Sequence, residues 1–227
     1  MTPRIQRVAA NAAGRDFLIG DLHGCLDQLQ AKLAQASFAP EQGDRLFAVG
    51  DLVDRGPDSL GCLNLLREPW FFSVLGNHDQ MLLDALADPG MGRSQAFLFH
   101  SLNGGEWAAT MILEQDPLLL ELARMVAALP HVMVVGEGRQ RFNIVHAQLL
   151  ADLNPPRQYS DADLDAQNWG EADSHAIRLM WSRVLGAEAG WAAIENIKGN
   201  FYPRPVADLL RPQSGAATGI SGIAFLH

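Results

Sequence analysis

Short apolar segments repeat three times in the first 90 residues, each followed by a glycine-containing polar turn and then by a helical pattern. The apolar segments, each long enough for a buried strand, are residues 17–20, 45–50 and 71–76. Apolar positions at helical spacing follow them in residues 25–33, 58–66 and 80–87. This alternation predicts an α/β fold in which parallel strands bring their carboxyl ends, and the turns after them, to one edge of a sheet.

The rest of the chain has a different pattern. Residues 105–129 carry a stripe of leucine and methionine that predicts helix, and two apolar runs at 131–136 and 141–146 predict a β-hairpin. Residues 151–173 are polar and contain prolines, which predicts a long surface loop. A helix or an irregular active-site segment at 175–185 and a closing strand at 222–227 complete the prediction. Without internal repeats, low-complexity tracts or a linker, residues 1–227 are predicted to form a single domain.

The composition, with 48% hydrophobic and 19% charged residues, fits a globular protein. A net charge of −9 argues against nucleic acid as a partner, because phosphate contacts need clustered Lys and Arg. Cys25 and Cys62 form no disulfide framework, which favours a reducing compartment. The sequence has no run suited to spanning a bilayer and no signal-peptide pattern at residues 1–16. We therefore expect a cytoplasmic protein without a membrane partner; nothing in the sequence predicts an oligomeric state.

Each of the three predicted strands ends in a polar cluster flanked by glycine. The clusters are GDLHG (20–24), GDLVDRG (50–56) and GNHD (76–79). His146 ends a fourth predicted strand. Each signal alone has a structural explanation, such as an Asx turn at Asn77. Together, however, carboxylates, imidazoles and an amide at one sheet edge predict a mixed oxygen and nitrogen site for Mn, Fe or Zn ions.

These clusters resemble the sequence blocks of the phosphoprotein phosphatase family, within the metallophosphoesterase superfamily, and especially its small bacterial and phage-type serine/threonine phosphatases. The family blocks GDxHG, GDxVDRG and GNHE match the three clusters, with Asp79 in place of the usual glutamate. Further matches are LNGGEW (102–107), VHA (145–147), MWSR (180–183) and IKG (197–199). The resemblance implies a central β-sandwich of mixed sheets flanked by helices, with a dinuclear metal site at one edge.

The resemblance also implies a metal-binding role for five residues. Two divalent cations, expected to be manganese with iron or zinc as alternatives, would be bridged by Asp51. Asp21 and His23 would hold the first ion, and Asn77 and His146 would hold the second. A hydroxide formed between the two ions would then attack phosphorus in line.

The other matching residues would act on the phosphate and its leaving group. His78 would be the general acid that protonates the leaving alkoxide, with Asp54 hydrogen-bonded to its other nitrogen. The alternative for Asp54 is a salt bridge to Arg55. Arg55 and Arg183 would bind the phosphoryl oxygens through their bidentate guanidinium groups, and the alternative for Arg183 is an ordinary surface charge.

The chain departs from the family near its C-terminus. The family supplies one more histidine to the second metal, in a Gly-His-Thr turn after IKG, whereas here no histidine follows IKG before His227. His175 lies outside any motif and is expected at the surface. Because perturbing even indirect partners of a metal lowers affinity or activity about 10–100-fold, we expect the second metal to bind loosely and hydrolysis to be weakened.

Three functions fit these residues. The first is hydrolysis of phosphoserine or phosphothreonine in proteins, and of small phosphate esters. The second is symmetrical hydrolysis of diadenosine tetraphosphate, by analogy with a sister branch that also has GNHD. The third is a weakly active or non-catalytic protein that binds a phosphorylated ligand, for which the absent histidine is the support. His100, His131 and Cys25 are interpreted as structural residues.

Overall fold

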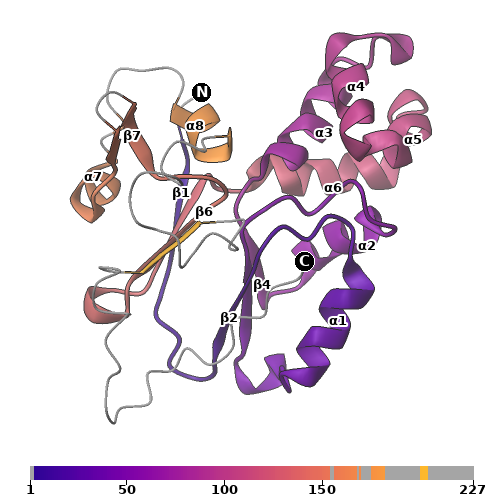
Figure 1. The fold of residues 1–227 in the computed structure, drawn as a ribbon. Helices are drawn as coiled ribbons and strands as arrows, with labels where there is room; N and C mark the ends of the chain where they lie inside the picture. Colours follow the sequence, from indigo (N-terminus) through magenta and orange to yellow (C-terminus); the bar gives the residue numbers. More distant parts are fainter. Residues whose placement is uncertain (1–2, 154–155, 168, 170–174, 182–199, 204–227) are drawn as a thin grey trace.

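Two β-sheets packed face to face form the centre of the protein in the computed structural model, which describes residues 3–153, 156–167, 169, 175–181 and 200–203 (Figure 1). The first sheet is parallel and has the order β2 (Asp16–Ile19), β3 (Arg45–Ala48) and β4 (Phe71–Ser73). The second sheet has the order β1 (Ile5–Val8), β5 (Val132–Val135), β6 (Phe142–Val145) and β9 (Asn200–Pro203). Its β1–β5 pair is parallel, and its other two pairs are antiparallel. The predicted sandwich, its mixed strand directions and the β5–β6 hairpin are therefore confirmed.

Apolar side chains from both sheets form the layer between them. Phe47 of β3 and Phe142 of β6 meet edge to face, with 5.9 Å between their ring centroids. The buried cluster around them also contains Leu18, Val74, Met133 and Ile144. Burying such side chains contributes about 1.5–3 kcal/mol each, so this layer holds the two sheets together.

Helices lie along the outer side of the parallel sheet and also gather above it, at the upper right of Figure 1. They are α1 (Leu26–Gln35), α2 (Ser59–Asn64), α3 (Asn77–Ala87), α4 (Gln95–His100), α5 (Ala109–Leu113) and α6 (Pro117–Ala128). Their core-facing side chains, such as Leu29, Leu63, Leu82 and Leu122, share one buried cluster with Leu46 of β3. Among the described residues, no helix is long and apolar enough to cross a membrane.

The predicted helical region 105–129 is divided into two helices. Gln115 has a positive φ of 54°, which ends the first helix. The side chain of Asp116 then accepts hydrogen bonds from the backbone N–H groups of Leu118 and Leu119, and Pro117 occupies the first helical position. An aspartate cap followed by proline is a common start for a helix, so α6 begins here.

The predicted surface loop at 151–173 is wrong. This region contains a hairpin of β7 (Leu150–Leu153) and β8 (Pro156–Gln158), followed by α7 (Asp161–Ala166). Tyr159, Leu164 and Trp169 are buried against the second sheet, because they share a cluster with Val134 and Val145. The helix predicted at 175–185 is present as α8 (His175–Trp181) over the part that the structure describes, and the strand predicted at 222–227 lies outside it.

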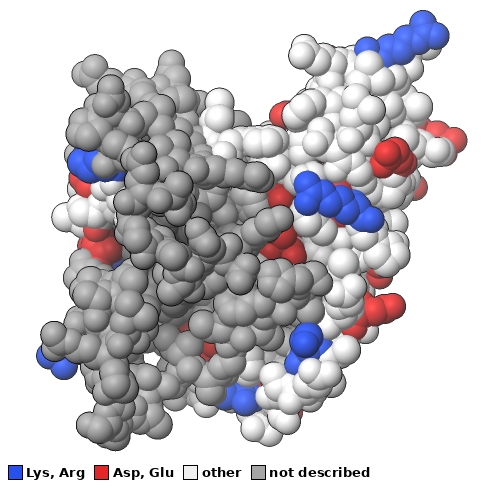
Figure 2. Space-filling model, in the orientation of Figure 1, with Lys and Arg blue, Asp and Glu red and all other residues white. Residues whose placement is uncertain are grey.

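Charged side chains of both signs are scattered over the described part of the face drawn in Figure 2. On the face drawn in Figure 2, the basic side chains of the described residues stand singly among acidic ones and form no continuous stripe. This distribution differs from the clustered Lys and Arg that typify a nucleic-acid-binding surface.

A buried carboxylate near the base of the parallel sheet gives the fold a testable dependence on pH. Asp44 is 3% exposed and pairs with Arg15 at 2.5 Å, while the backbone N–H groups of Arg15 and Ala39 also donate to it. The Arg15 hydrogen bond lowers the pKa of Asp44 to about 2, despite the opposing effect of burial. Because the pKa of Asp44 is lower in the folded than in the unfolded protein, the ionised carboxylate stabilises the fold at pH values above the unfolded-state pKa. This stabilisation is lost as the pH falls from about 4 to 2.

We therefore expect Asp44→Asn to be less stable than the wild type in urea unfolding at pH 7. The difference in unfolding free energy should shrink between about pH 4 and pH 2, where the wild-type carboxylate gains its proton. A difference that stays constant down to pH 2.5 would contradict the assigned role of the Asp44 charge.

Candidate active site

The three polar turns after β2, β3 and β4 lie together at the carboxyl edge of the parallel sheet. The backbone N–H groups of Leu22 and His23 donate to the carbonyl oxygen of Asp51, at 3.0 and 2.7 Å. In turn, the backbone N–H of His78 donates to the Asp51 side chain at 2.8 Å. The first and third turns are thus both tied to the second, as the parallel topology predicts.

Asp51 occupies the centre of this site and is 2% exposed. Its Oδ1 accepts the N–H of His78 at the start of α3, where the positive end of the helix dipole favours a carboxylate. Its Oδ2 lies 3.7 Å from Nε2 of His23 and 3.5 Å from Nε2 of His146. One carboxylate oxygen therefore lies between two imidazoles, which is the position that a bridging ligand requires.

Both imidazoles are oriented by backbone carbonyl groups. Nδ1 of His23 lies 2.9 Å from the carbonyl oxygen of Val53, and Nδ1 of His146 lies 2.8 Å from that of Val49. Donation from Nδ1–H leaves Nε2 of each ring aimed at Asp51. Such carbonyl partners commonly fix the tautomer and orientation of metal-binding histidines.

The donor set fits a divalent cation. Nε2 of His146 lies 2.8 Å from the side-chain oxygen of Asn77, so a positive charge, a proton or a metal ion, belongs between these two atoms. The ligand atoms of Asp21, Asp51 and His146 lie within 4.8 Å of one another, as do those of His23, Asp51 and His78. Nε2 of His23 is also 4.0 Å from Asp21. All five predicted ligands are brought together, while their division between two ions stays a prediction.

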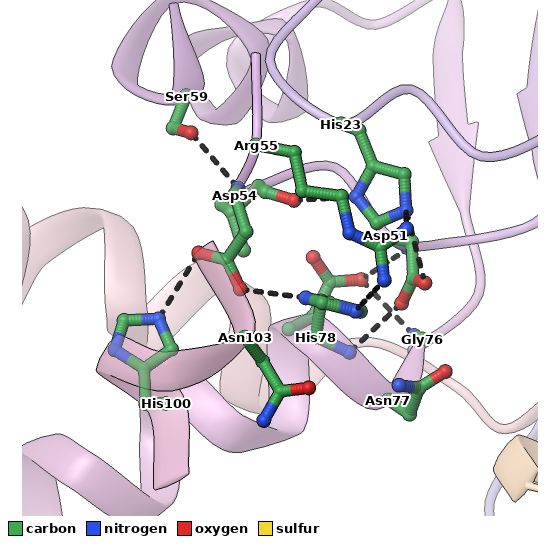
Figure 3. A network of polar contacts seen from close by, with 12 residues as sticks. His23, Asp51, Asp54, Arg55, Ser59, Gly76, Asn77, His78, His100 and Asn103 are labelled. Carbon is green, nitrogen blue, oxygen red and sulfur yellow. Dashed lines mark hydrogen bonds and ion pairs between the residues drawn. The ribbon is translucent and has the colours of Figure 1, made fainter. Parts of the chain in front are cut away.

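A second set of contacts joins His78 to Asp54 and Arg55 (Figure 3). Nδ1 of His78 lies 2.7 Å from Oδ2 of Asp54, and the two side chains are 2% and 0% exposed. The guanidinium of Arg55 reaches Nε2 of His78 at 2.8 Å and Nε2 of His23 at 2.6 Å. Because a guanidinium only donates, both Nε2 atoms are acceptors here and Nδ1 of His78 donates to Asp54.

The alternative of a salt bridge between Asp54 and Arg55 is not what the structure contains, because the described ion pairs of Asp54 are with His78 and His100. Burial raises the pKa of Asp54, but hydrogen bonds from His100, His78 and Trp107 outweigh it and lower the pKa to about 2. Asp54 is therefore an anion at neutral pH and accepts the Nδ1 proton of the His78 ring.

His100 is a site residue whose contact was missed at the sequence level. It is buried, as a structural histidine would be, yet its Nε2 donates to Oδ1 of Asp54 at 3.0 Å. Trp107 donates to the same oxygen at 2.8 Å, and the carbonyl of Gly104 accepts the backbone N–H of Arg55 at 3.1 Å. The segment LNGGEW (102–107) contains Gly104 and Trp107 and was the sequence signal for those two contacts, whereas His100 lies outside it.

The backbone at the site adopts conformations that side chains usually avoid. His23, Asp51, Asp54 and Arg55 have φ angles of 43°, 50°, 73° and 67°. Left-handed backbone at non-glycine residues costs of order 1–3 kcal/mol each and clusters at functional sites. A Cβ atom at Gly76 would overlap the backbone and side chain of Asp51, so only glycine permits this close approach of two turns.

Asp79, which replaces the usual glutamate, links the second and third turns. Its fully buried carboxylate accepts the backbone N–H groups of Asp51, Leu52 and Gly76 at 2.9, 2.9 and 3.0 Å. Burial and the charge of Asp51 raise the pKa of Asp79 to about 7, against the lowering effect of the backbone donors. Asp79 therefore holds the second and third turns together through these backbone N–H groups.

We expect Asp79→Ala to lower the unfolding free energy by about 3–5 kcal/mol, because three buried N–H groups lose their acceptor. Urea unfolding measures this loss. The unfolding free energy of Asp79→Asn, which keeps one acceptor oxygen, should lie between those of the wild type and Asp79→Ala. An Asp79→Ala protein within 1 kcal/mol of the wild type would contradict the linking role.

Arg183, the predicted second phosphate-binding residue, lies outside the described residues, and so does His227. The stretch in which the family's additional histidine would stand, after residue 199, also lies outside them except for β9. The prediction of a loosely bound second metal therefore stays a prediction.

Comparisons with known proteins agree with this geometry. Residues 17–209 match the calcineurin-like phosphoesterase family. Serine/threonine-protein phosphatase 1 of Salmonella typhimurium strain LT2 is 42% identical over 196 residues, which cover 82% of this chain and 81% of that protein. A symmetrical bis(5'-nucleosyl)-tetraphosphatase of Yersinia pestis strain Pestoides F is 52% identical over 81 residues, which cover 35% of this chain and 27% of that protein.

A solved structure shares the fold. A serine/threonine phosphatase from Saccharomyces cerevisiae aligns with a TM-score of 0.50 and 19% identity, covering 79% of this chain and 52% of that one, so the present chain spans about half its length. The match over residues 17–209, together with the converging carboxylates and imidazoles, identifies the chain as a member of the calcineurin-like phosphoesterase family of metal-dependent hydrolases.

Proposed function

We propose that this protein hydrolyses phosphate monoesters, and that its substrates are phosphoserine and phosphothreonine in proteins. The observation that carries the proposal is the position of Arg55, whose guanidinium lies between His23 of the ligand cluster and Nε2 of His78. A phosphate bound by Arg55 would therefore face the cluster around Asp51 on one side and a proton-donating imidazole on the other.

The metal ions belong to the proposal as well. Asp21, His23, Asp51, Asn77 and His146 would hold two divalent cations, with manganese as the expected metal. When bound, such ions supply positive charge to the phosphoryl oxygens and make a water more acidic. The chain's own contribution is to fix the ligand atoms through the carbonyl groups of Val49 and Val53.

Departure of the leaving group depends on His78. A protonated His78 would give its Nε2 proton to the leaving alkoxide, while the anionic Asp54 holds the proton on Nδ1 and keeps the ring in orientation. Arg55 would exchange its contacts with the two imidazoles for the phosphoryl oxygens, for which its planar donors are well suited. Arg183 is proposed as a second phosphate-binding residue on the basis of its motif alone.

The extent of the two sequence matches favours a protein phosphatase over a dinucleotide hydrolase. The relation to the Salmonella phosphatase extends over most of both chains, whereas the relation to the Yersinia tetraphosphatase extends over about a third of this chain. The local identity in that shorter match is nevertheless higher, which makes symmetrical hydrolysis of diadenosine tetraphosphate the second candidate.

A comparison of substrates tests the proposal. The wild-type protein with added Mn²⁺ is assayed on a phosphoserine peptide and on diadenosine tetraphosphate, with Asp51→Asn as the control for contaminating activity. We expect kcat/KM for the peptide to exceed that for the dinucleotide by at least tenfold. The reverse order would assign the second candidate, and peptide turnover no faster than that of the control would indicate a non-catalytic phosphate binder.

A further inference from the structure

We propose that His100 is a positioning residue for proton transfer by His78, because it holds the carboxylate of Asp54 in the orientation that aims the His78 ring. The proposal rests on the proposed function, in which His78 is the general acid. Among the described residues, the hydrogen bond of the His100 side chain is to Asp54, so its effect would be transmitted through Asp54.

The two oxygens of Asp54 have separate partners. Oδ2 is used by Nδ1 of His78 at 2.7 Å, whereas Oδ1 receives Nε2 of His100 at 3.0 Å and Nε1 of Trp107 at 2.8 Å. Figure 3 shows His100 and His78 on opposite sides of this carboxylate. Two donors on Oδ1 fix the rotation of the carboxylate, and this rotation in turn sets the direction of Oδ2 and of the ring bonded to it.

The chain departs from regular helix to bring both donors to one oxygen. His100 and Trp107 are seven residues apart, and in a straight α-helix they would lie about 10 Å apart along the axis. Here α4 continues into a wide π-type turn at Ser101–Gly105, in which Gly104 has a φ of 100°. Such turns are frequent at functional sites, and this one folds Trp107 back toward Asp54.

Gly105 makes room for the imidazole. A Cβ atom at this position would overlap the ring atoms of His100, including Nε2. The backbone of Gly105 has φ −90° and ψ 10°, which an alanine can also adopt. A glycine is therefore required here by the His100 ring and not by the backbone conformation.

The proton of His100 can be assigned from its surroundings. The ring is 0% exposed, and within the described residues Nδ1 has no hydrogen-bond partner. A proton on Nδ1 would leave a buried donor unsatisfied, at a cost of about 1–3 kcal/mol. His100 therefore carries its proton on Nε2 and makes its one hydrogen bond to Asp54.

The test compares leaving groups. A general acid matters most when the leaving oxygen is strongly basic, so phenyl phosphate depends on it and 2,4-dinitrophenyl phosphate does not. We expect His100→Leu to lower kcat about 10–100-fold on phenyl phosphate and less than about threefold on the dinitrophenyl ester. Bound manganese should be unchanged. The matched control is His131→Leu, which removes an equally buried ring that accepts its hydrogen bond from the Arg4 backbone.

Two more variants separate positioning from a general loss of structure. His100→Gln retains an N–H donor and should restore at least half of the lost rate on phenyl phosphate. Gly105→Ala removes no polar group, yet it should reproduce the selective loss by displacing the His100 ring. In a His100→Ala background, the added Gly105→Ala change should have little further effect, because the two substitutions act through one contact.

The outcomes distinguish this proposal from the function on which it rests. If His78→Asn changes the ratio of kcat on phenyl phosphate to kcat on the dinitrophenyl ester and His100→Leu does not, the positioning role is overturned while the general acid stands. If His78→Asn leaves the ratio unchanged, the general acid and the positioning role fail together. As a readout that does not need turnover, the downfield NMR signal of the proton between His78 and Asp54 should be lost in His100→Leu and kept in His131→Leu.

Discussion

We expect His78→Asn to lower kcat on a phosphoserine peptide by about 10²–10⁴-fold, the range that a lost general acid produces. The asparagine side chain cannot deliver a proton to the leaving serine oxygen. The backbone N–H of residue 78, which donates to Asp51, remains in place. KM and bound metal should therefore change little, and steady-state kinetics with metal analysis of the same preparation measures all three quantities.

The leaving group provides the control for this result. On 2,4-dinitrophenyl phosphate, whose leaving oxygen needs no proton, the same variant should lose far less activity. A His78→Asn protein that retains wild-type kcat on the peptide would exclude His78 as the acid. A variant that loses its manganese would instead indicate that His78 is a ligand, as its proximity to His23 and Asp51 permits.

Asp51→Asn should have the second large effect. Its Oδ2 lies between the imidazoles of His23 and His146, so replacing it removes the one charged oxygen that both sides of the cluster share. We expect manganese affinity to fall by more than about 100-fold, above the range seen for indirect partners of a metal, and turnover to fall with it. Equilibrium dialysis against Mn²⁺ and peptide hydrolysis measure the two losses.

A surface carboxylate on α3 provides the matched control for Asp51→Asn. Asp84→Asn changes the net charge by the same amount at an exposed position, where the carboxylate contacts Gln80, and should leave metal binding and turnover at wild-type values. The asparagine oxygen at position 51 can still accept the N–H of His78, so the fold should survive. Equal manganese affinity in Asp51→Asn and the wild type would contradict the bridging position.

The strand-end turns could be predicted from sequence because their signals are local. Each turn combines an apolar run, a glycine and a polar side chain within a few residues, and parallel pairing then determines that the turns meet. The same dependence on local signals explains why the sequence does not predict strand β1 of the second sheet. Strand β1 buries neither Gln6 nor Arg7 and is only half-buried at Ile5 and Val8, so its pattern is too weak to recognise.

The region 151–173 failed for a related reason. Its buried side chains, Tyr159, Leu164 and Trp169, occur singly at spacings of five residues, and no strand or helix period connects them. Their burial follows from packing against Val134 and Val145, which are close in space and distant in the sequence. Polar composition was therefore a poor guide to exposure here.

The contacts of Asp54 show the same limit within the site. The partner His78 could be predicted because both residues belong to recognisable blocks. His100 lies 46 residues from Asp54, outside any block, and reaches it only because the chain after α4 widens and turns at Gly104. Spacing along the sequence cannot reveal a contact that depends on such an irregular turn.

The central claim is that Asp21, His23, Asp51, Asn77 and His146 gather around divalent cations. Anomalous diffraction from crystals grown with Mn²⁺ tests it most directly. The account predicts anomalous peaks on either side of Oδ2 of Asp51, toward Nε2 of His23 and Nε2 of His146. An ordered map of these side chains without any anomalous peak at ligand distance from Asp51 would contradict it.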